Sequence, residues 1–507
     1  MKTTVWILGT QLTPRVSSLE GLRRDEVTIL MIESIERCRQ LPYHRQKLVL
    51  VWSAMRHFAE EMRKRGYDVD YHPVQPDFEQ ALRSHLKQYQ PDRLRIMEDA
   101  EYGVTGGLAE MARRLGAKVE VTPNNLFLSD NADFRQRAQG KQRLVLEPFY
   151  RRMREQTGLL MDGKVPVSGR WNYDSENRLP PPREHQPVPT REFKPDSVTR
   201  EVMGEANRHF GEHFGDGEPF NWPVTRRQAE QALQDFLDHR LSQFGPYEDA
   251  MLSSDPVMYH SLISPMLNLG LLDPLEVCQA AAERYAAGAV PLASAEGFIR
   301  QIIGWREFMY QVYQFAMPAY RESNALDAHL PRPYFYWDGD TDMFCVACCV
   351  QDLIRRGHNH HQQRLMITGN FALIAGLSAQ EINEWYWFAF VDAYDWVVTP
   401  NVLGLSLYAD GGLVASKPYA ASASFINRMS DYCTHCHYDH RAALGDRACP
   451  FNSLYWDFLA RHAERFSNNP RMNLALSQLR RKDPQALTDL RRQAARWRDQ
   501  LRNADRI

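Results

Sequence analysis

The stretch HNHHQQRLMITGN (His358–Asn370), with the two clusters that follow it, decides the fold of this chain. An aromatic run, WYWF, occupies Trp385–Phe388, and the spacing CTHC occurs at Cys433–Cys436. A further cysteine, Cys449, stands before a proline. Two cysteines in CxxC spacing with a third nearby are typical of a metal or cluster site. Because histidines, acids and aromatic residues lie close to them along the chain, we expect a redox protein.

Three kinds of site are open to these cysteines. A disulfide set is disfavoured, because thiols in a chain without a signal peptide normally stay reduced. Zinc would need one nearby histidine beside three thiolates, namely His435, His437 or His440. An iron–sulfur cluster needs a fourth thiolate. The upstream segment offers three cysteines among which spacing does not choose: Cys345, Cys348 and Cys349.

Length and charge limit the number of domains and the kinds of partner that this chain can have. The 507 residues are enough for two or three domains, and the formal net charge of −2 gives no overall bias toward nucleic acid or membranes. Basic runs at Arg151–Arg154 and Arg480–Arg498 fit solvated helix faces or a phosphate-binding face. The N-terminus has no signal peptide pattern, and no apolar run reaches the roughly 18 residues of a membrane span. We therefore expect a soluble, cytoplasmic protein.

Residues 1–130 alternate strand and helix patterns. Helices are predicted over residues 54–65, capped by Ser53, and over residues 78–88. This alternation predicts an α/β domain with a doubly wound parallel sheet. The predicted strands are Thr4–Leu8, Val27–Ile32, Lys47–Trp52, Val69–His72, Arg93–Met97 and Lys118–Thr122.

Small molecules bind such sheets at the carboxyl ends of the strands. Gly9, Thr10 and Gln11 follow the first predicted strand, and Glu33 and Ser34 follow the second. We expect these residues to line a ligand site. The chain has no GxGxxG after a strand, so the dinucleotide fingerprint is missing.

Residues 131–225 are interpreted as a long, irregular interdomain linker. The prolines of Leu179–Pro182 and those that follow block helix interiors and central strands. From residue 226 the pattern is helical to the end, beginning with a capping box at Thr225 and Gln228. The turn HSLISP (His260–Pro265) fits either a phosphate site or a plain capped helix start. Gly304, inside a predicted helix, suggests the close approach of a planar group.

The chain resembles the photolyase/cryptochrome family. WREF (Trp305–Phe308) and the HSLISP turn resemble its flavin domain, and HHQQR (His360–Arg364) resembles the paired-histidine helix of (6-4) photolyases. The set Cys345, Cys433, Cys436 and Cys449 is similar to the [4Fe–4S] ligand pattern of the iron–sulfur bacterial cryptochromes and photolyases, the prokaryotic (6-4) photolyases. The resemblance covers essentially the whole chain.

The resemblance implies an α/β antenna domain (residues 1–130), a linker (131–225) and a large all-α catalytic domain (226–507) that holds a U-shaped FAD. It also implies a 6,7-dimethyl-8-ribityllumazine antenna, which we expect at the strand ends described above. The residues expected to bind FAD are Tyr247, Asp249, His260, Ser261, Leu262, Ile263, Ser264, Gln301, Trp305, Glu307, Gln362, Asp392, Asp395 and Asn401.

Two family motifs are replaced. ILGTQL (Ile7–Leu12) stands in place of a Trp-rich first-strand motif, and TPNVLG (Thr399–Gly404) stands where Asn-Gly-x-Trp-Gln-Trp is usual. The residue that faces flavin N5 is then Val398 or a neighbour. The electron route to the flavin should also differ from three tryptophans.

The implied activity is light-driven repair of (6-4) pyrimidine–pyrimidone photoproducts in ultraviolet-damaged DNA, by a lyase that is a monomer. Such repair needs an electron from excited, reduced FAD and a proton donor at the lesion, a role that suits histidine with its pKa near roughly 6.5. We expect His361 to be the donor, His360 its partner and Tyr419 a second lesion contact. The alternatives are a photoreceptor without repair activity and repair of cyclobutane dimers.

Electron supply is expected from the aromatic run. Spacing places Trp385, Phe388, Asp392 and Asp395 on one helical face, which core packing would also explain. The two acids would then meet the ribose or the ring N–H groups of FAD. The expected hopping sites are Trp385, Trp337 and Tyr386.

Overall fold

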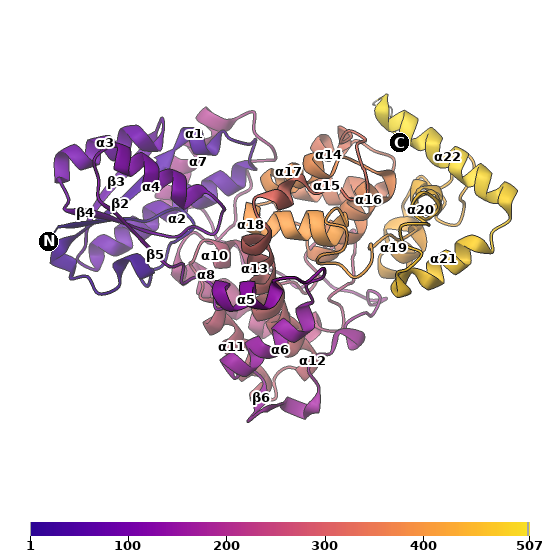
Figure 1. Cartoon of the computed structure of the whole chain (residues 1–507), viewed down its shortest axis with the longest axis horizontal. Helices are drawn as coiled ribbons and strands as arrows, with labels where there is room; N and C mark the ends of the chain where they lie inside the picture. Colours follow the sequence, from indigo (N-terminus) through magenta and orange to yellow (C-terminus); the bar gives the residue numbers. More distant parts are fainter. Residues whose placement is uncertain (1, 504–505) are drawn as a thin grey trace.

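The computed structural model describes residues 2–503 and 506–507. Figure 1 shows an α/β domain at the N-terminal end, a helical body beside it, and the last helices α20, α21 and α22 on the far side. A lower lobe combines α5 and α6 with α11 and α12. The expected division into an α/β part and a helical part is therefore confirmed as a fold class.

The N-terminal domain is built on a five-stranded parallel sheet in the order β3-β2-β1-β4-β5. Alternate side chains of β1 reach opposite faces: Val5 packs toward α2 (Arg45–Lys64), and Trp6 packs toward α3 and α4. Helices thus cover both faces, as predicted for a doubly wound sheet. The other bounds are β1 Thr3–Trp6, β2 Val27–Ser34, β3 Asp68–Gln75, β4 Arg93–Met97, β5 Val119–Thr122, α1 Ile35–Cys38, α3 Phe78–Tyr89 and α4 Val104–Arg114.

The strand predicted over Lys47–Trp52 is wrong, because these residues lie inside α2. The helix begins after His44, whose Nδ1 accepts a hydrogen bond from the backbone N–H of Gln46 at 3.1 Å. Ser53 is therefore an interior residue and not the N-cap. The run is apolar on all sides because α2 is buried between the sheet and the helical body, where Gln46 Nε2 donates to the carbonyl of Arg355 at 2.8 Å. Periodicity does not distinguish a short buried helix segment from a buried strand.

Residues 131–225 are irregular only in part. The proline-rich residues 178–196 contain no helix or strand. The prediction is wrong on either side of them, because helices form there and pack on the body: Phe210 meets Trp52 of α2 edge to face, with ring centroids 5.5 Å apart. The elements of this region are α5 Asn131–Ala138, α6 Leu146–Thr157, β6 Met161–Asp162, β7 Val165–Pro166 and α7 Ser197–Phe210.

Helices follow from residue 226 onward, as predicted. Thr225 Oγ1 accepts from the N–H of Gln228 at 3.2 Å, and Gln228 Oε1 accepts from the N–H of Val224 at 2.9 Å, so this N-terminus is capped from both sides. The helices are α8 Arg226–His239, α9 Leu241–Phe244, α10 Ser264–Asn268, α11 Pro274–Ala286, α12 Leu292–Ile299, α13 Glu307–Ala316, α14 Phe335–Asp338, α15 Phe344–Arg356, α16 Asn370–Ala375, α17 Ala379–Ala389, α18 Asp395–Thr399, α19 Ala423–Met429, α20 Pro450–Arg461, α21 Asn473–Arg480 and α22 Pro484–Arg502.

Three π-helical segments, η5 (Arg300–Arg306), η7 (Gln363–Gly369) and η8 (Pro400–Ser406), interrupt this helical pattern. Such wide turns occur frequently at functional sites. A Cβ on Gly304 of η5 would lie 3.2 Å from the ring of Tyr150, so the planar group near this glycine is a tyrosine of α6.

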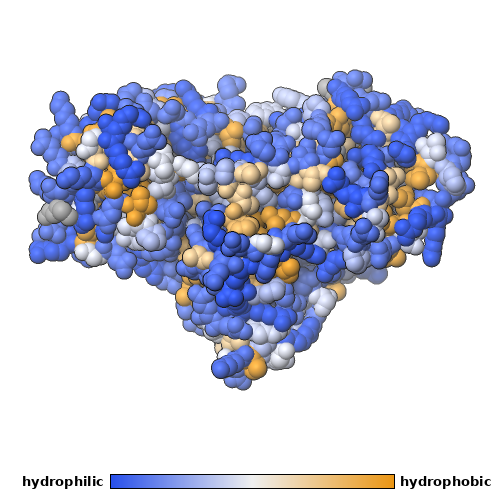
Figure 2. All heavy atoms as spheres, viewed as in Figure 1, coloured by the Kyte–Doolittle hydropathy of each residue, from blue (hydrophilic) through white to orange (hydrophobic). Residues whose placement is uncertain are grey.

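The surface facing the viewer is mostly hydrophilic, with small apolar patches over the N-terminal domain, the centre and the C-terminal side (Figure 2). Within the described residues, no helix combines the length and the apolar character needed to cross a membrane.

Candidate functional site

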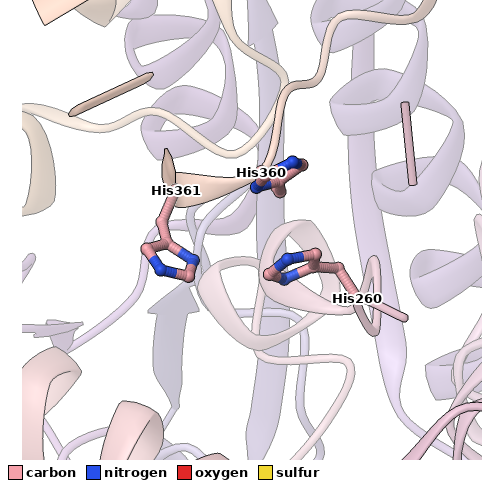
Figure 3. Close-up of side chains that lie close together, drawn as sticks. All are labelled: His260, His360 and His361. Atoms are coloured by element: carbon pink, nitrogen blue, oxygen red, sulfur yellow. The ribbon is translucent and has the colours of Figure 1, made fainter. Parts of the chain in front are cut away.

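Three histidines from two distant segments meet in the helical body (Figure 3). The rings of His260 and His360 are stacked, with centroids 4.4 Å apart and planes 9° apart. His361 presents its ring edge-on to His260, at 5.4 Å and 70°. One ring nitrogen from each histidine lies within 4.8 Å of the other two. His260 precedes α10, and the other two histidines precede η7, so these two segments position the cluster.

The two stacked histidines are buried and uncharged. Burial, helped by the nearby charge of His361, lowers the pKa of both His260 and His360 well below the usual value. Three of their nitrogens, His260 Nε2 and both ring nitrogens of His360, have no hydrogen-bond partner in the protein. A buried polar atom without a partner costs about 1–3 kcal/mol. The cluster therefore offers hydrogen-bonding groups to a molecule that the protein does not itself supply.

His361 has a different electrostatic environment. Its side chain is 43% exposed, and its Nε2 lies 3.4 Å from Asp249 Oδ1. Partial burial works against the charged imidazolium, but Asp249 and Glu248 outweigh it and raise the pKa of His361 above its usual value. Of the three histidines, this one is the most readily protonated, so it is the best placed to give a proton to a neighbouring group.

Glutamines hold the two acids beside His361. Gln362 Nε2 donates to Asp249, and Gln301 Nε2 donates to Glu248. Burial raises the pKa of Glu248. The carbonyl oxygen of the Gln362 side chain is buried without a partner, like the histidine nitrogens. The structure thus brings His260, Asp249, Gln301 and Gln362 of the predicted FAD set together at the histidines.

Asp392 forms the other polar centre of this region. Arg364 Nη1 and Nη2 donate to its two oxygens at 3.0 Å each, and Ser264 Oγ donates at 2.7 Å. Burial alone would raise the pKa of Asp392, but the Arg364 charge reverses this and lowers it to about 2. The prediction of one helical face through Asp392 and Asp395 is wrong, because α17 ends at Ala389 and both acids lie beyond it.

Other predicted FAD residues have protein partners elsewhere. Glu307 accepts from the N–H groups of Leu128 and Ser129 at 2.9 Å each. Asp395 accepts from Thr399 Oγ1 at 2.6 Å and also from Tyr313 and Arg321. The remaining predicted residues have no polar contact with the three histidines among the described bonds; these are Tyr247, Ser261, Leu262, Ile263, Trp305 and Asn401, whose Nδ2 donates to the Val397 carbonyl at 2.7 Å.

The predicted electron-transfer residues lie in two aromatic groups. Trp385 is fully buried and meets Tyr386 edge to face at 4.8 Å. The Tyr386 hydroxyl donates to the Arg364 carbonyl at 2.6 Å, so this group adjoins the histidine segment. Trp337 packs instead against Phe388, with centroids 5.9 Å apart. Tyr419, the predicted second lesion contact, is partly buried, and burial raises its pKa.

Four cysteines line one cavity: Cys345 of α15, Cys433, Cys436 and Cys449. Cys348 and Cys349 do not line it, and the Cys349 thiol points instead toward the Tyr432 hydroxyl at 4.0 Å. Cys345 and Cys449 are buried, and Cys433 and Cys436 are partly buried. All eight cysteines are free thiols in the structure.

A buried hydrogen-bonded chain joins this cysteine cavity to the histidines. Gln363 Nε2 donates to the hydroxyl of Tyr432, which lines the cavity, at 3.1 Å. Gln363 Oε1 accepts from the backbone N–H of His360 at 3.0 Å. Sequence reasoning missed Gln363, because nothing in the second of two glutamines after a histidine pair indicates such a bridge.

A second cavity lies between the sheet and the helical body, lined by Thr10, Gln11, Asp99, Arg306 and Tyr394 among others. Burial and the neighbouring Glu101 raise the pKa of Asp99. Arg306 Nε and the Tyr394 hydroxyl are buried without partners. As at the histidines, the cavity presents polar atoms that the protein leaves unpaired.

Of the residues predicted at the strand ends, only Thr10 and Gln11 line this interdomain cavity. Glu33 is fully buried elsewhere, where Arg56 Nε donates to it at 2.8 Å. Ser34 caps α1 by accepting from the N–H of Arg37 at 3.1 Å. Gly9 permits close packing, because a Cβ there would lie 2.9 Å from Val51 of α2. The expectation that both strand ends line one site is therefore wrong.

Comparisons with known proteins agree with this architecture. The family model described as deoxyribodipyrimidine photo-lyase-related protein matches residues 5–222. The (6-4) photolyase of Agrobacterium fabrum is 44% identical over 504 residues, which is 98% of this chain and 99% of that protein.

Solved structures share the fold. A bacterial class III photolyase from Agrobacterium tumefaciens has a TM-score of 0.59 at 16% identity and covers 92% of this chain and 98% of its own. A cryptochrome of Synechocystis has a TM-score of 0.58 at 14% identity and covers 99% of both chains. Because the 44% identity extends over nearly the full length of both proteins, this chain belongs to the photolyase/cryptochrome family.

Proposed function

We propose that this protein repairs (6-4) photoproducts in ultraviolet-damaged DNA in a light-driven reaction. The observation that carries the proposal is the contrast within the histidine cluster. His361 holds a proton beside Asp249, while the uncharged His260 and His360 present unpaired nitrogens next to it. The relative that is 44% identical is named a (6-4) photolyase.

FAD would bind beside the histidines, among residues that include Gln301, Gln362 and Ser264. The fit rests on the buried atoms that lack partners, His260 Nε2 and Gln362 Oε1, because a flavin ring system carries both donors and acceptors. When bound and reduced, FAD supplies the electron that light releases. The protein supplies the buried surroundings, and Trp385 and Tyr386 provide a buried aromatic route next to Arg364.

His361 would donate the proton to the lesion. It is the exposed member of the cluster, so a base flipped out of the duplex can reach it. Asp249 keeps its imidazole charged before the reaction, and Gln362 holds Asp249 in place. His360 is stacked on His260 and bonded through its backbone N–H to Gln363. It would orient the side of the histidine cluster that faces the lesion.

The four thiols of the cysteine cavity would bind a [4Fe–4S] cluster. The assignment is supported by the four thiols that line one cavity, two of them buried, because an iron–sulfur cluster is held by four thiolates. Replacing Cys345 with serine should remove iron and sulfide from the purified protein, whereas Cys348→Ser should leave both in place. Equal iron content in the two variants would refute the ligand set.

The interdomain cavity would bind the lumazine antenna. The unpaired Arg306 Nε and Tyr394 hydroxyl, with Thr10 and Asp99, suit a heterocycle that is rich in carbonyl and N–H groups. Arg306→Met should release a fluorescent pigment from protein purified with it and leave flavin content unchanged. Retention of the pigment would place the antenna elsewhere.

The remaining proposals concern the protein's location, its oligomeric state, its binding to DNA and the roles of its three regions. We propose a cytoplasmic monomer that binds damaged DNA through basic side chains, in a salt-dependent manner. The division into residues 1–130, 131–225 and 226–507 would then separate antenna, connection and catalysis, with α6 of the connection packed into the helical body.

The test is direct. Oligonucleotides that carry either a (6-4) photoproduct or a cyclobutane dimer are mixed with the protein, and recovered pyrimidines are measured under blue light and in the dark. The proposal predicts recovery from the (6-4) lesion alone, and only under light. No recovery from either lesion would favour a photoreceptor, and recovery from the dimer alone would change the substrate.

A further inference from the structure

A second group of ligand-type side chains lies far from the histidine cluster, at the outer edge of the sheet. Asp70 Oδ2 is 2.9 Å from His72 Nε2 and 2.7 Å from His85 Nδ1. One ligand atom from each residue lies within 4.8 Å of the other two. Asp70 and His72 belong to β3 and His85 to α3, which lie side by side at the N-terminal end of Figure 1.

The fold explains why these three side chains converge. Residues two apart in a strand face the same side of the sheet, so Asp70 and His72 both face α3. The intervening Tyr71 reaches the opposite side, where its hydroxyl donates to Glu33 at 2.5 Å. β3 is the last strand of the sheet on this side, so one flank of the group adjoins solvent.

The surroundings match those of a metal site. His85 is fully buried, and its Nε2 is 2.7 Å from Thr4 Oγ1 on β1, which fixes the ring and presents Nδ1 to Asp70. Metal-binding histidines commonly use the second ring nitrogen in this way. Asp70 and His72 are 16% and 17% exposed, so an ion can reach the group from solvent.

We propose that Asp70, His72 and His85 bind a divalent transition-metal ion, for which zinc is the best fit. Two imidazoles and one carboxylate are ligands that zinc prefers, and three protein ligands leave one position for water. Bonds of about 2.0–2.1 Å would separate tetrahedral ligand atoms by about 3.3 Å. The two separations from Asp70 Oδ2, 2.9 Å to His72 and 2.7 Å to His85, need to open by only about half an ångström. The side chain of Asp70, which both contacts share, can supply this movement.

The ion would act on the fold and not on repair. It would join the edge strand β3 to α3 and, through Thr4, to the central strand β1. The site is independent of the proposed function, because it shares no residue with the histidine cluster or with either cavity.

The experiment uses the full-length protein with its cofactors. Protein is incubated with excess Zn²⁺ and separated from free ion, and bound zinc is counted by elemental analysis in wild type, His72→Gln and His239→Gln. His72 is replaced because it is partly exposed and the variant should fold. His239 is the matched control, a 59% exposed histidine that lies 3.3 Å from the single acid Asp235.

The proposal predicts that His72→Gln binds one zinc ion fewer than the other two proteins. Subtracting the counts removes zinc held by the cysteines or by the other histidines. Zinc should also raise the Tm of wild type more than that of His72→Gln, and anomalous scattering at the zinc edge should place an ion between Asp70, His72 and His85. Equal zinc counts in all three proteins, or crystals soaked in zinc without that peak, would overturn the site.

A second variant tests the positioning role of Thr4. Thr4→Val keeps the shape of the buried side chain and removes only the oxygen that holds His85. Zinc affinity should fall by about 10–100-fold, as it does when a supporting hydrogen bond to a ligand histidine is lost. Unchanged affinity, measured by calorimetric titration, would contradict the proposed arrangement of His85.

Discussion

Two basic residues of one short segment, Arg364 and His361, each pair with an aspartate, but the two pairs differ in burial and in distance. Arg364 meets buried Asp392 through two hydrogen bonds of 3.0 Å, and the pKa of Asp392 falls to about 2. Three residues earlier, half-exposed His361 meets Asp249 at 3.4 Å, and its pKa is raised. Asp392 therefore stays ionised at neutral pH, whereas the raised pKa of His361 favours its protonated form. The same segment thus combines a permanent clamp, the Arg364–Asp392 pair, with a titratable histidine.

The largest effect that this contrast predicts falls on repair. His361→Ala should lower the rate of (6-4) repair by about 10²–10⁴-fold, because the proton donor is lost. Flavin content should remain unchanged, since the side chain is half exposed. His329→Ala is the matched control, an exposed histidine 2.8 Å from Asp327. Repair at the wild-type rate in His361→Ala would remove this residue from the mechanism.

Breaking the clamp between Arg364 and Asp392 should lower the stability of the fold. Arg364→Met leaves Asp392 buried without its guanidinium partner and should lower the free energy of unfolding by about 3–5 kcal/mol. Arg355→Met, which removes a 60% exposed guanidinium 3.7 Å from Asp352, should change it by about 0–1 kcal/mol. Urea unfolding at neutral pH gives both values. Similar losses in the two variants would show that the Arg364 pair is not a clamp.

A smaller effect is expected at the bridge between the histidines and the cysteine cavity. Gln363→Leu deprives the N–H of His360 and the hydroxyl of Tyr432 of their buried partner. The free energy of unfolding should fall by about 1–3 kcal/mol. Gln485→Leu, on the exposed side of α22, should change it by less than about 0.5 kcal/mol. A loss no larger than in that control would mean that the bridge contributes nothing.

Much of the fold could be predicted from local signals. The strands β1, β2, β4 and β5, and the Thr225 cap, have short-range sequence patterns that predict them correctly. The α2 segment could not be read correctly, because its apolar faces reflect contacts with two domains at once. The helices α6 and α7 were hidden for a similar reason: prolines dominate the segment between them, while their own apolar residues pack on distant elements.

At the candidate site, too, some features are visible in the sequence and others depend on the folded structure. The histidine pair and the CxxC spacing are visible in the sequence, and the structure places Gln301, Gln362 and Asp249 beside the histidines. Spacing did not separate Cys345 from Cys348, whereas the path of α15 turns only Cys345 into the cavity. Strand ends are alike in sequence, so the pattern places Glu33 and Ser34 with Thr10. In the structure, Arg56 binds Glu33 and the start of α1 binds Ser34 elsewhere.

The most direct test of the account is the yield of (6-4) repair per absorbed photon, measured against pH in wild type and Asp249→Asn. A donor must be protonated, so repair should fall as the pH rises through the raised pKa of His361. Asp249→Asn removes a negative charge that supports the imidazolium, so the fall should move to lower pH. A shift in that direction, with flavin content unchanged, is the predicted result. Identical pH profiles for the two proteins would contradict the claim that Asp249 charges His361 for proton donation.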